Sequence, residues 1–274
     1  VSALLDTDYN LIQYSQSFLE SEKHIKSSLD KIVCLDSTLD SCSSFFAIIV
    51  ENISVHDSPK WLKQKLIGAG IQPFNNLLDF QNYITLETGY PFEFYDIDKI
   101  KSKLNTNEFS ISLNYNNKGS FLASNGCIYQ LTSDILTVKA NNEVLSLSGI
   151  IPNKEFLYTD ETKSLLIEGS IFNSKKIRQT SRAIGLRTER SARYEKGLNS
   201  NKLIESLCRL LYLLKVSNSK INCQFYSAAK GKDFERQIIN LNYQTIINYL
   251  VKILQISLIL RLNLGWRYQA WGNN

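Results

Sequence analysis

The chain has 274 residues, of which 43% are hydrophobic and 21% charged, enough for one or two domains with an ordinary hydrophobic core. Its net charge of +5 permits a polyanionic partner without requiring one. Five cysteines without CxxC spacing and only two histidines match no common zinc motif, so we expect free thiols in a reducing compartment and no metal site. The apolar run 253–264 is too short to cross a bilayer, and no membrane partner is expected.

The chain starts at Val1, contains no Met, and is rich in Asn, Ile and Lys. We therefore expect a fragment or a processed form, and the residue bias is that of an AT-rich coding sequence, such as an organellar one. Residues 1–43 are polar and rich in serine, and we interpret them as a linker or the tail of a preceding domain.

The next elements are a buried strand and two helices. The run FFAIIVENI (45–53) predicts the strand. In the first helix Ser58 is expected to cap the N-terminus and Pro59 to occupy the first turn. Its predicted core face is Trp61, Leu62, Leu66 and Ile67. A second helix is predicted over 77–88, with Leu78, Ile84 and Leu86 facing the core.

Strand signals dominate from 109 to 151, where apolar residues alternate between Asn/Gly/Ser turns, and a further strand is predicted over 164–172. Helices are predicted over 174–184 and 200–216, and a strand over 224–232. The fold class is therefore α+β, with mixed, mostly antiparallel sheets flanked by helices. The predicted domains are 44–216, a linker 217–236, and the truncated start of a small helical domain, 237–274.

The segment RQTSRAIGLRTERSARYEKG (178–197) concentrates positive charge. Its candidates for RNA contact are Arg178, Arg182, Arg187, Arg193 and Lys196, because cationic side chains neutralise phosphates. The alternative is that several of the arginines are internal struts paired with Glu168, Glu189 or Glu195.

The same segment resembles the central editing domain of the β subunit of phenylalanine–tRNA ligase. A second stretch, SPKWLKQKLIGAGIQPFNNLLDFQNYITLETGYPFEFYDIDKI (58–100), resembles another motif of that family, in the right order. The resemblance covers about residues 44–216.

Membership would imply an α2β2 heterotetramer that charges tRNA(Phe) with phenylalanine, with ATP and Mg²⁺ acting in the α subunit and no cofactor bound by this chain. Together with the AT-rich residue bias, the resemblance would indicate a plastid location, with the cytoplasm as the alternative. In bacterial relatives the central domain hydrolyses tyrosine wrongly attached to tRNA, because a phenylalanine pocket rejects an added hydroxyl only weakly.

The resemblance places Asn82, Glu93, Gly149, Glu168, Thr188 and Arg190 in the editing pocket, with Glu168 as the reader of the tyrosine hydroxyl. Three positions depart from the family pattern. Glu93 replaces a histidine, Pro152 replaces a glycine in the loop that keeps Gly149, and Arg190 replaces a small residue. We therefore expect a degenerate pocket. The alternatives are an active editing hydrolase that uses Glu93 and Glu168, and a free-standing RNA-binding module.

Overall fold

The structure, a computed structural model, describes residues 33–34, 41–115, 118–199, 202–229 and 242–252. The chain divides into two compact units, Val1–Phe234 and Glu235–Asn274. In the second unit the described element is a helix over 243–252. The first unit is an α+β domain, as the sequence predicted.

The strands and helices of the first unit alternate irregularly along the chain. The strands are β1 (Val33–Cys34), β2 (Cys42–Glu51), β3 (Phe92–Asp96), β4 (Ile111–Asn114), β5 (Gly119–Leu122), β6 (Ile128–Leu131), β7 (Thr137–Ala140), β8 (Glu143–Leu147), β9 (Ile151–Pro152), β10 (Ser164–Phe172) and β11 (Asn222–Ala229). The helices are α3 (Lys60–Gly68), α4 (Asn76–Thr88), α5 (Ile97–Leu104), α6 (Ser174–Ala183), α7 (Glu189–Glu195) and α8 (Leu203–Ser217), with a 3₁₀ turn at Lys154–Phe156.

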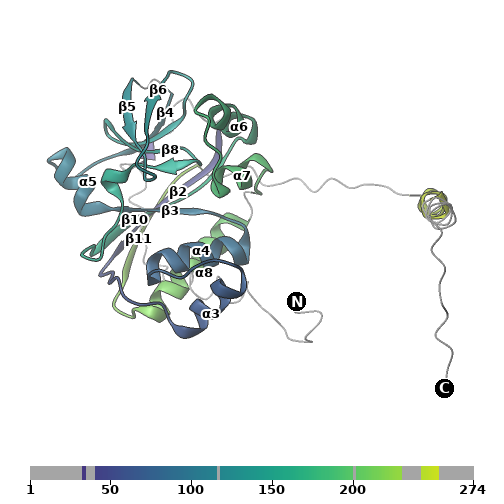
Figure 1. Ribbon diagram of the computed structural model, residues 1–274, viewed down its shortest axis with the longest axis horizontal. Coiled ribbons are helices and arrows are strands. Elements are labelled where there is room, and N and C mark those ends of the chain that lie inside the picture. The colour runs from purple at the N-terminus through teal and green to yellow at the C-terminus, as the bar shows by residue number, and fades with distance from the viewer. Residues whose placement is uncertain (1–32, 35–40, 116–117, 200–201, 230–241, 253–274) are drawn as a thin grey trace. The chain divides into compact units, whose positions relative to one another are not determined.

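A four-stranded antiparallel sheet, in the order β11-β2-β10-β3, forms the middle layer of the unit. A five-stranded sheet, β1-β4-β7-β8-β9, lies on one side of it, and helices α3, α4 and α8 lie on the other (Figure 1). The five-stranded sheet is antiparallel except for the β1–β4 pair, and β5 and β6 form a separate hairpin. Mostly antiparallel pairing was the prediction.

Strand β2 shows why the middle sheet must be covered on both faces. Its alternate residues enter two different hydrophobic clusters: Phe45 and Ala47 pack toward the five-stranded sheet, whereas Phe46, Ile48 and Val50 pack toward the helices. A strand with apolar residues at every position is stable only when both faces are buried. The continuous apolar run in the sequence therefore fixed this strand as an internal one.

The predicted capping of the first helix is wrong. Pro59 is the residue before α3, which has no side-chain cap, and the Ser58 hydroxyl donates instead to the buried Asp79 carboxylate of α4. A buried carboxylate needs donors more than a helix end that can reach solvent. The helix α4 does have a side-chain cap, because Asn75 accepts a hydrogen bond from the Leu78 amide.

The predicted core faces of α3 and α4 are only half right. Leu62 and Leu66 are buried, but Trp61 and Ile67 are exposed. In α4 the predicted Ile84 is buried, whereas Leu86 is exposed. Apolar residues adjacent in sequence lie about 100° apart around a helix, so a single sheet face does not cover all of them.

Some boundaries also differ from the prediction. The strand β3 and helix α5 were not predicted, while β10 spans the residues predicted for it. The helix predicted from 200 begins at Leu203, and residues 200–201 lie outside the described ranges. Most of the predicted linker 1–43 also lies outside them, although it contains β1 and the start of β2. The predicted domain boundaries stay predictions.

No described helix is long and apolar enough to cross a membrane. The described side chains include no group of three or more His, Cys, Asp or Glu that could hold a metal ion. The run 253–264 lies outside the described residues.

The position of Gly169 in β10 gives a test of this packing. A Cβ atom there would lie 2.7 Å from the Phe92 ring on β3, so Gly169→Ala should lower the free energy of unfolding by about 1–3 kcal/mol. Gly68→Ala at the end of α3 meets nothing within 4 Å and is the control. The free energies come from urea denaturation, and equal stability of the two variants would contradict the β3–β10 packing.

Candidate functional site

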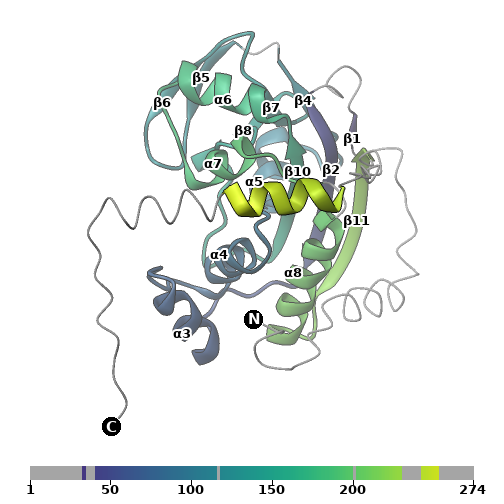
Figure 2. The same cartoon turned by 90° about the vertical axis from the view of Figure 1, so that its right-hand side faces the viewer.

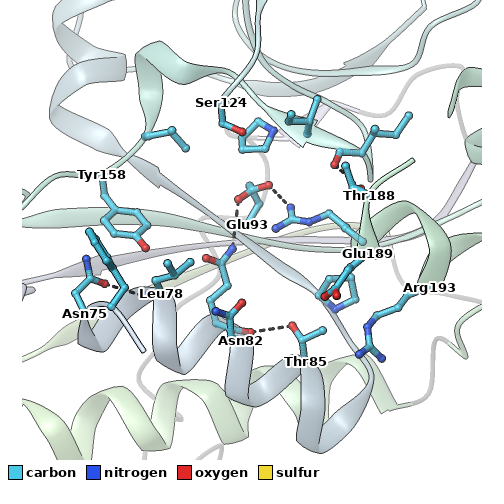
Figure 3. Close-up of a pocket in the computed structure, with 18 of the residues that line it drawn as sticks. Asn75, Leu78, Asn82, Thr85, Glu93, Ser124, Tyr158, Thr188, Glu189 and Arg193 are labelled. Carbon is cyan, nitrogen blue, oxygen red and sulfur yellow. Dashed lines mark hydrogen bonds and ion pairs between the residues drawn. The ribbon is translucent and has the colours of Figure 1, made fainter. Parts of the chain in front are cut away.

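A pocket of about 710 Å³ lies among α4, the segment around β9 and α7 (Figure 3). Of the six predicted pocket residues, Asn82, Glu93, Thr188 and Arg190 line it. Gly149 and Glu168 do not. Four of the six residues therefore line one cavity, and their role in editing stays a prediction.

Glu93 and Glu168 are direct cross-strand neighbours, because β3 and β10 pair with these two residues opposite each other. Side chains two apart on a strand share a face. Tyr95 therefore lies on the same face as Glu93, and Ser170 on the same face as Glu168. Two carboxyl groups opposite each other repel when both are ionised, so this face needs compensating donors.

Glu168 receives both of its donors from inside the domain. The Tyr95 hydroxyl donates to its Oε2 at 2.8 Å, and the Ser170 hydroxyl donates to its Oε1 at 2.8 Å. Burial raises the pKa of Glu168, while these two hydrogen bonds act against that rise and the neighbouring Glu93 adds to it. The predicted arginine strut is not the direct partner of this carboxyl group, since a tyrosine hydroxyl of the chain itself is.

Arg190 compensates the other carboxyl group. Its guanidinium contacts the Glu93 carboxylate and also donates to the Phe92 carbonyl at 3.0 Å. Gln81 of α4 donates to the same two residues. Burial raises the pKa of Glu93, and the charge of Arg190 acts against that rise. Arg190 is therefore an internal strut, but its acidic partner is Glu93 and not one of the three glutamates that were predicted.

The place of Arg190 follows from the edge of the sheet. Strand β3 is the last strand of the four-stranded sheet, so its Phe92 carbonyl has no further strand to pair with. Gln81 and Arg190 donate to this carbonyl instead, and the guanidinium also contacts the carboxylate of Glu93, which lines the pocket.

Gly149 serves packing rather than the pocket. Its φ is +68°, and a Cβ atom would meet the side chains of Phe172, Ile177 and Tyr194 at 2.9–3.0 Å. A glycine is required there on both counts. Pro152 does line the pocket, and its carbonyl accepts the Ser124 amide at 2.9 Å.

Thr188 begins helix α7. Its hydroxyl donates to the Ile150 carbonyl and accepts the Ser191 amide, as part of a capping box. The Thr188 hydroxyl therefore already makes hydrogen bonds within the protein, although Thr188 lines the cavity. By contrast, the side chain of Asn82 makes no hydrogen bond to any described residue, so its amide is available to a ligand.

The five predicted RNA contacts divide by location. Arg178, Arg182, Arg187 and Lys196 are exposed, whereas Arg193 is half-buried and lines the pocket. Gly185, with a φ of +66°, turns the chain between α6 and α7, as expected.

Sequence reasoning missed Gln81, Tyr95 and Ser170. The signal for the last two is the two-residue spacing from Glu93 and Glu168, which places each pair on one face once the strands are known. The pairing of β3 with β10 is not visible in the sequence, because it joins segments separated by several other elements.

The comparison with known protein families agrees with this fold. Residues 41–218 match the B3/4 domain, and the chain belongs to that family. It is 45% identical to the chloroplastic phenylalanine–tRNA ligase β subunit of Phaeodactylum tricornutum over 91% of this chain and 35% of that protein. The resemblance seen in the sequence motifs is thus confirmed.

Two further relatives carry related names. The phenylalanine–tRNA ligase β subunit of Trichormus variabilis is 31% identical over 78% of this chain and 26% of the relative. The chloroplastic β subunit of Porphyra purpurea is 33% identical over 76% of this chain and 28% of the relative. The chain thus spans about a third or less of the length of these relatives.

The Arg190–Glu93 pair can be tested by its effect on stability. Arg190→Ala leaves a buried carboxylate with only the uncharged donors of Gln81 and the Phe94 amide, so the free energy of unfolding should fall by about 3–5 kcal/mol. Adding Glu93→Gln should recover part of that loss, since no charge then remains unpaired. The exposed Arg182→Ala is the control, expected within about 0.5 kcal/mol of the wild type. Additive effects of the two changes in urea denaturation would contradict the pair.

The raised pKa of Glu168 predicts a pH dependence of stability. Above the ordinary pKa of 4.5, the unfolded state releases the proton while the folded state retains it, so stability falls as pH rises through the raised pKa. Glu168→Gln should make this decline of stability shallower. The decline that remains in this variant is due to Glu93, whose pKa is also raised by burial. Urea denaturation between pH 4.5 and 7.5 measures it, with the exposed Glu161→Gln as control. A decline as steep in Glu168→Gln as in the wild type would show that Glu168 does not titrate in this way.

Proposed function

We propose that this chain is the central part of a phenylalanine–tRNA ligase β subunit and supports ATP-dependent charging of tRNA(Phe) by an α subunit. The support is the B3/4 match over 41–218 and the 45% identity to a named β subunit. The partners are the α subunit, in an α2β2 assembly, and tRNA(Phe). The compartment is the plastid, because two of the relatives described above are chloroplastic.

ATP and Mg²⁺ belong to the α subunit in this proposal. The described residues of this chain do not fit them: they lack an acidic or histidine cluster for a metal, and the sequence has no GxxxxGK[ST] loop for phosphates. We therefore assign no step of the charging reaction to this chain. Its contribution is to brace the α subunit and the tRNA.

The pocket is degenerate for tyrosine editing, and the observation that carries this proposal is the Arg190–Glu93 contact. Arg190 lines the pocket and its guanidinium is bound to the Glu93 carboxylate, so a large charged side chain stands where the family has a small residue. Both oxygens of Glu168 also hold internal hydroxyl donors, so a substrate phenol would have to displace the Tyr95 hydroxyl.

One observation favours the alternative of an active editing hydrolase. The cavity keeps about 710 Å³ with an unpaired Asn82 amide on its wall, which is ample for an aminoacyl group. In this alternative Glu93, released from Arg190 by a ligand, would orient the attacking water.

Tyrosyl-tRNA(Phe) deacylation distinguishes the two functions. The assembled enzyme, with this sequence in its β subunit, should release tyrosine no faster than the spontaneous rate, and Glu168→Ala should change nothing. Phenylalanine charging in the same preparation shows that the assembly is intact. Tyrosine release above the spontaneous rate, lost in Glu168→Ala, would replace the degenerate pocket by the editing hydrolase.

A further inference from the structure

The outer surface of α6 is a continuous basic face that the pocket does not use. Its members are exposed cations: Lys175, Lys176, Arg178 and Arg182 of α6, Arg187 of the following turn, and Lys196 after α7. We call this set the α6 basic face. It differs from the basic segment of the sequence, because it gains two lysines and loses Arg190 and Arg193 to the pocket.

Helical spacing aligns the cations. Lys175, Arg178 and Arg182 are separated by three and four residues, so they form one row about 10 Å long on the surface of α6. Ile177, Thr180 and Ser181 face inward and are buried. The helix therefore presents its charged arc outward because its few buried residues are all on the opposite side.

The positive charge of this face is poorly compensated. Helix α6 contains no acidic residue, and the nearby Glu195 carboxylate lies 3.8 Å from Arg178 and 3.7 Å from Arg187. These contacts are long, and both arginine side chains stay more than 60% exposed. Lys176 lies over the Tyr115 ring at 5.9 Å, which leaves its charge intact. The Glu195 side chain is only 9% exposed, so these contacts are partly buried, but its single negative charge is shared between two arginines and leaves the face with a net positive charge.

The composition of the face favours a nucleic acid over an acidic protein. Its exposed positions on α6 are Lys, Lys, Arg, Gln, Arg and Ala, with no large apolar side chain. Protein interfaces need an apolar or aromatic centre, whereas protein–nucleic acid interfaces are more polar and much more positive. Guanidinium groups also bind phosphate oxygens in pairs. We propose that the α6 basic face binds the phosphodiester backbone of a folded RNA.

Helix α3 provides a matched comparison within the same domain. It lies at the opposite end of the first unit from α6 in both views (Figure 1, Figure 2). Its exposed Lys60 and Lys65 alternate with the exposed apolar Trp61 and Ile67, which interrupt the positive surface. Removing two lysines there changes the net charge as much as removing two arginines from α6.

This inference rests on the proposed function in taking RNA as the polyanion, but its test needs neither an α subunit nor an amino acid. The full 274-residue chain is titrated against fluorescein-labelled unfractionated transfer RNA at several salt concentrations. Loss of RNA binding would therefore leave the charging proposal standing, and loss of charging would leave the binding measurement unaffected.

Arg178→Gln/Arg182→Gln should weaken RNA binding about tenfold or more at low salt. It should also reduce the slope of log K against log salt by about 2, one for each lost phosphate contact. Lys60→Gln/Lys65→Gln should stay within about twofold of the wild type in the same titration. Arg178→Lys/Arg182→Lys keeps both charges and should keep the slope, which separates loss of contact from loss of folding.

Three results would overturn the proposal. One is an unchanged salt slope in Arg178→Gln/Arg182→Gln, and another is an equal loss in the α3 variant, which would mean a response to net charge alone. The third is displacement of the RNA by poly-L-glutamate at equal charge concentration, which would assign the face to an acidic protein partner.

Discussion

The register of β10 between β2 and β3 decides the architecture of both the core and the pocket. Pairing on both sides places one face of the strand against the helices and the other against the five-stranded sheet. The same register sets Glu93 opposite Glu168 on a buried face. A shift by one residue would reverse every side chain of β10, so core packing holds the two carboxyl groups together.

Two buried carboxyl groups side by side require donors, and the domain supplies them from different elements. Tyr95 and Ser170 donate to Glu168 from within the sheet, whereas Arg190 reaches Glu93 from α7. Because both carboxyl groups already bind side chains of the domain, they are not available to bind a substrate. The same side chains that stabilise the sheet therefore account for the proposed loss of editing, and no separate blocking element is needed.

The long basic segment divides into two surfaces because it folds as a helix, a turn at Gly185 and a second helix. Arg190 faces the sheet edge, where a buried partner fixes it. Arg178 and Arg182 face outward and are exposed, and Arg178 forms an ion pair with Glu195 at 3.8 Å. A single run of arginines thus supplies both an internal ion pair and an exposed positive face, and RNA contact by the exposed arginines stays a proposal.

The sequence by itself determined the family, the α+β class and β10, because long motifs and uninterrupted apolar runs are local properties. It also identified Asn82, Glu93, Thr188 and Arg190 as pocket residues. Only the tertiary structure decided that the Tyr95 hydroxyl donates to the Glu168 carboxyl group and that Gly149 is packed against three side chains. It also decided that the Ser58 hydroxyl donates to Asp79 instead of capping α3. Each of these depends on contacts between segments distant in the chain, and no local pattern specifies which strand lies beside which.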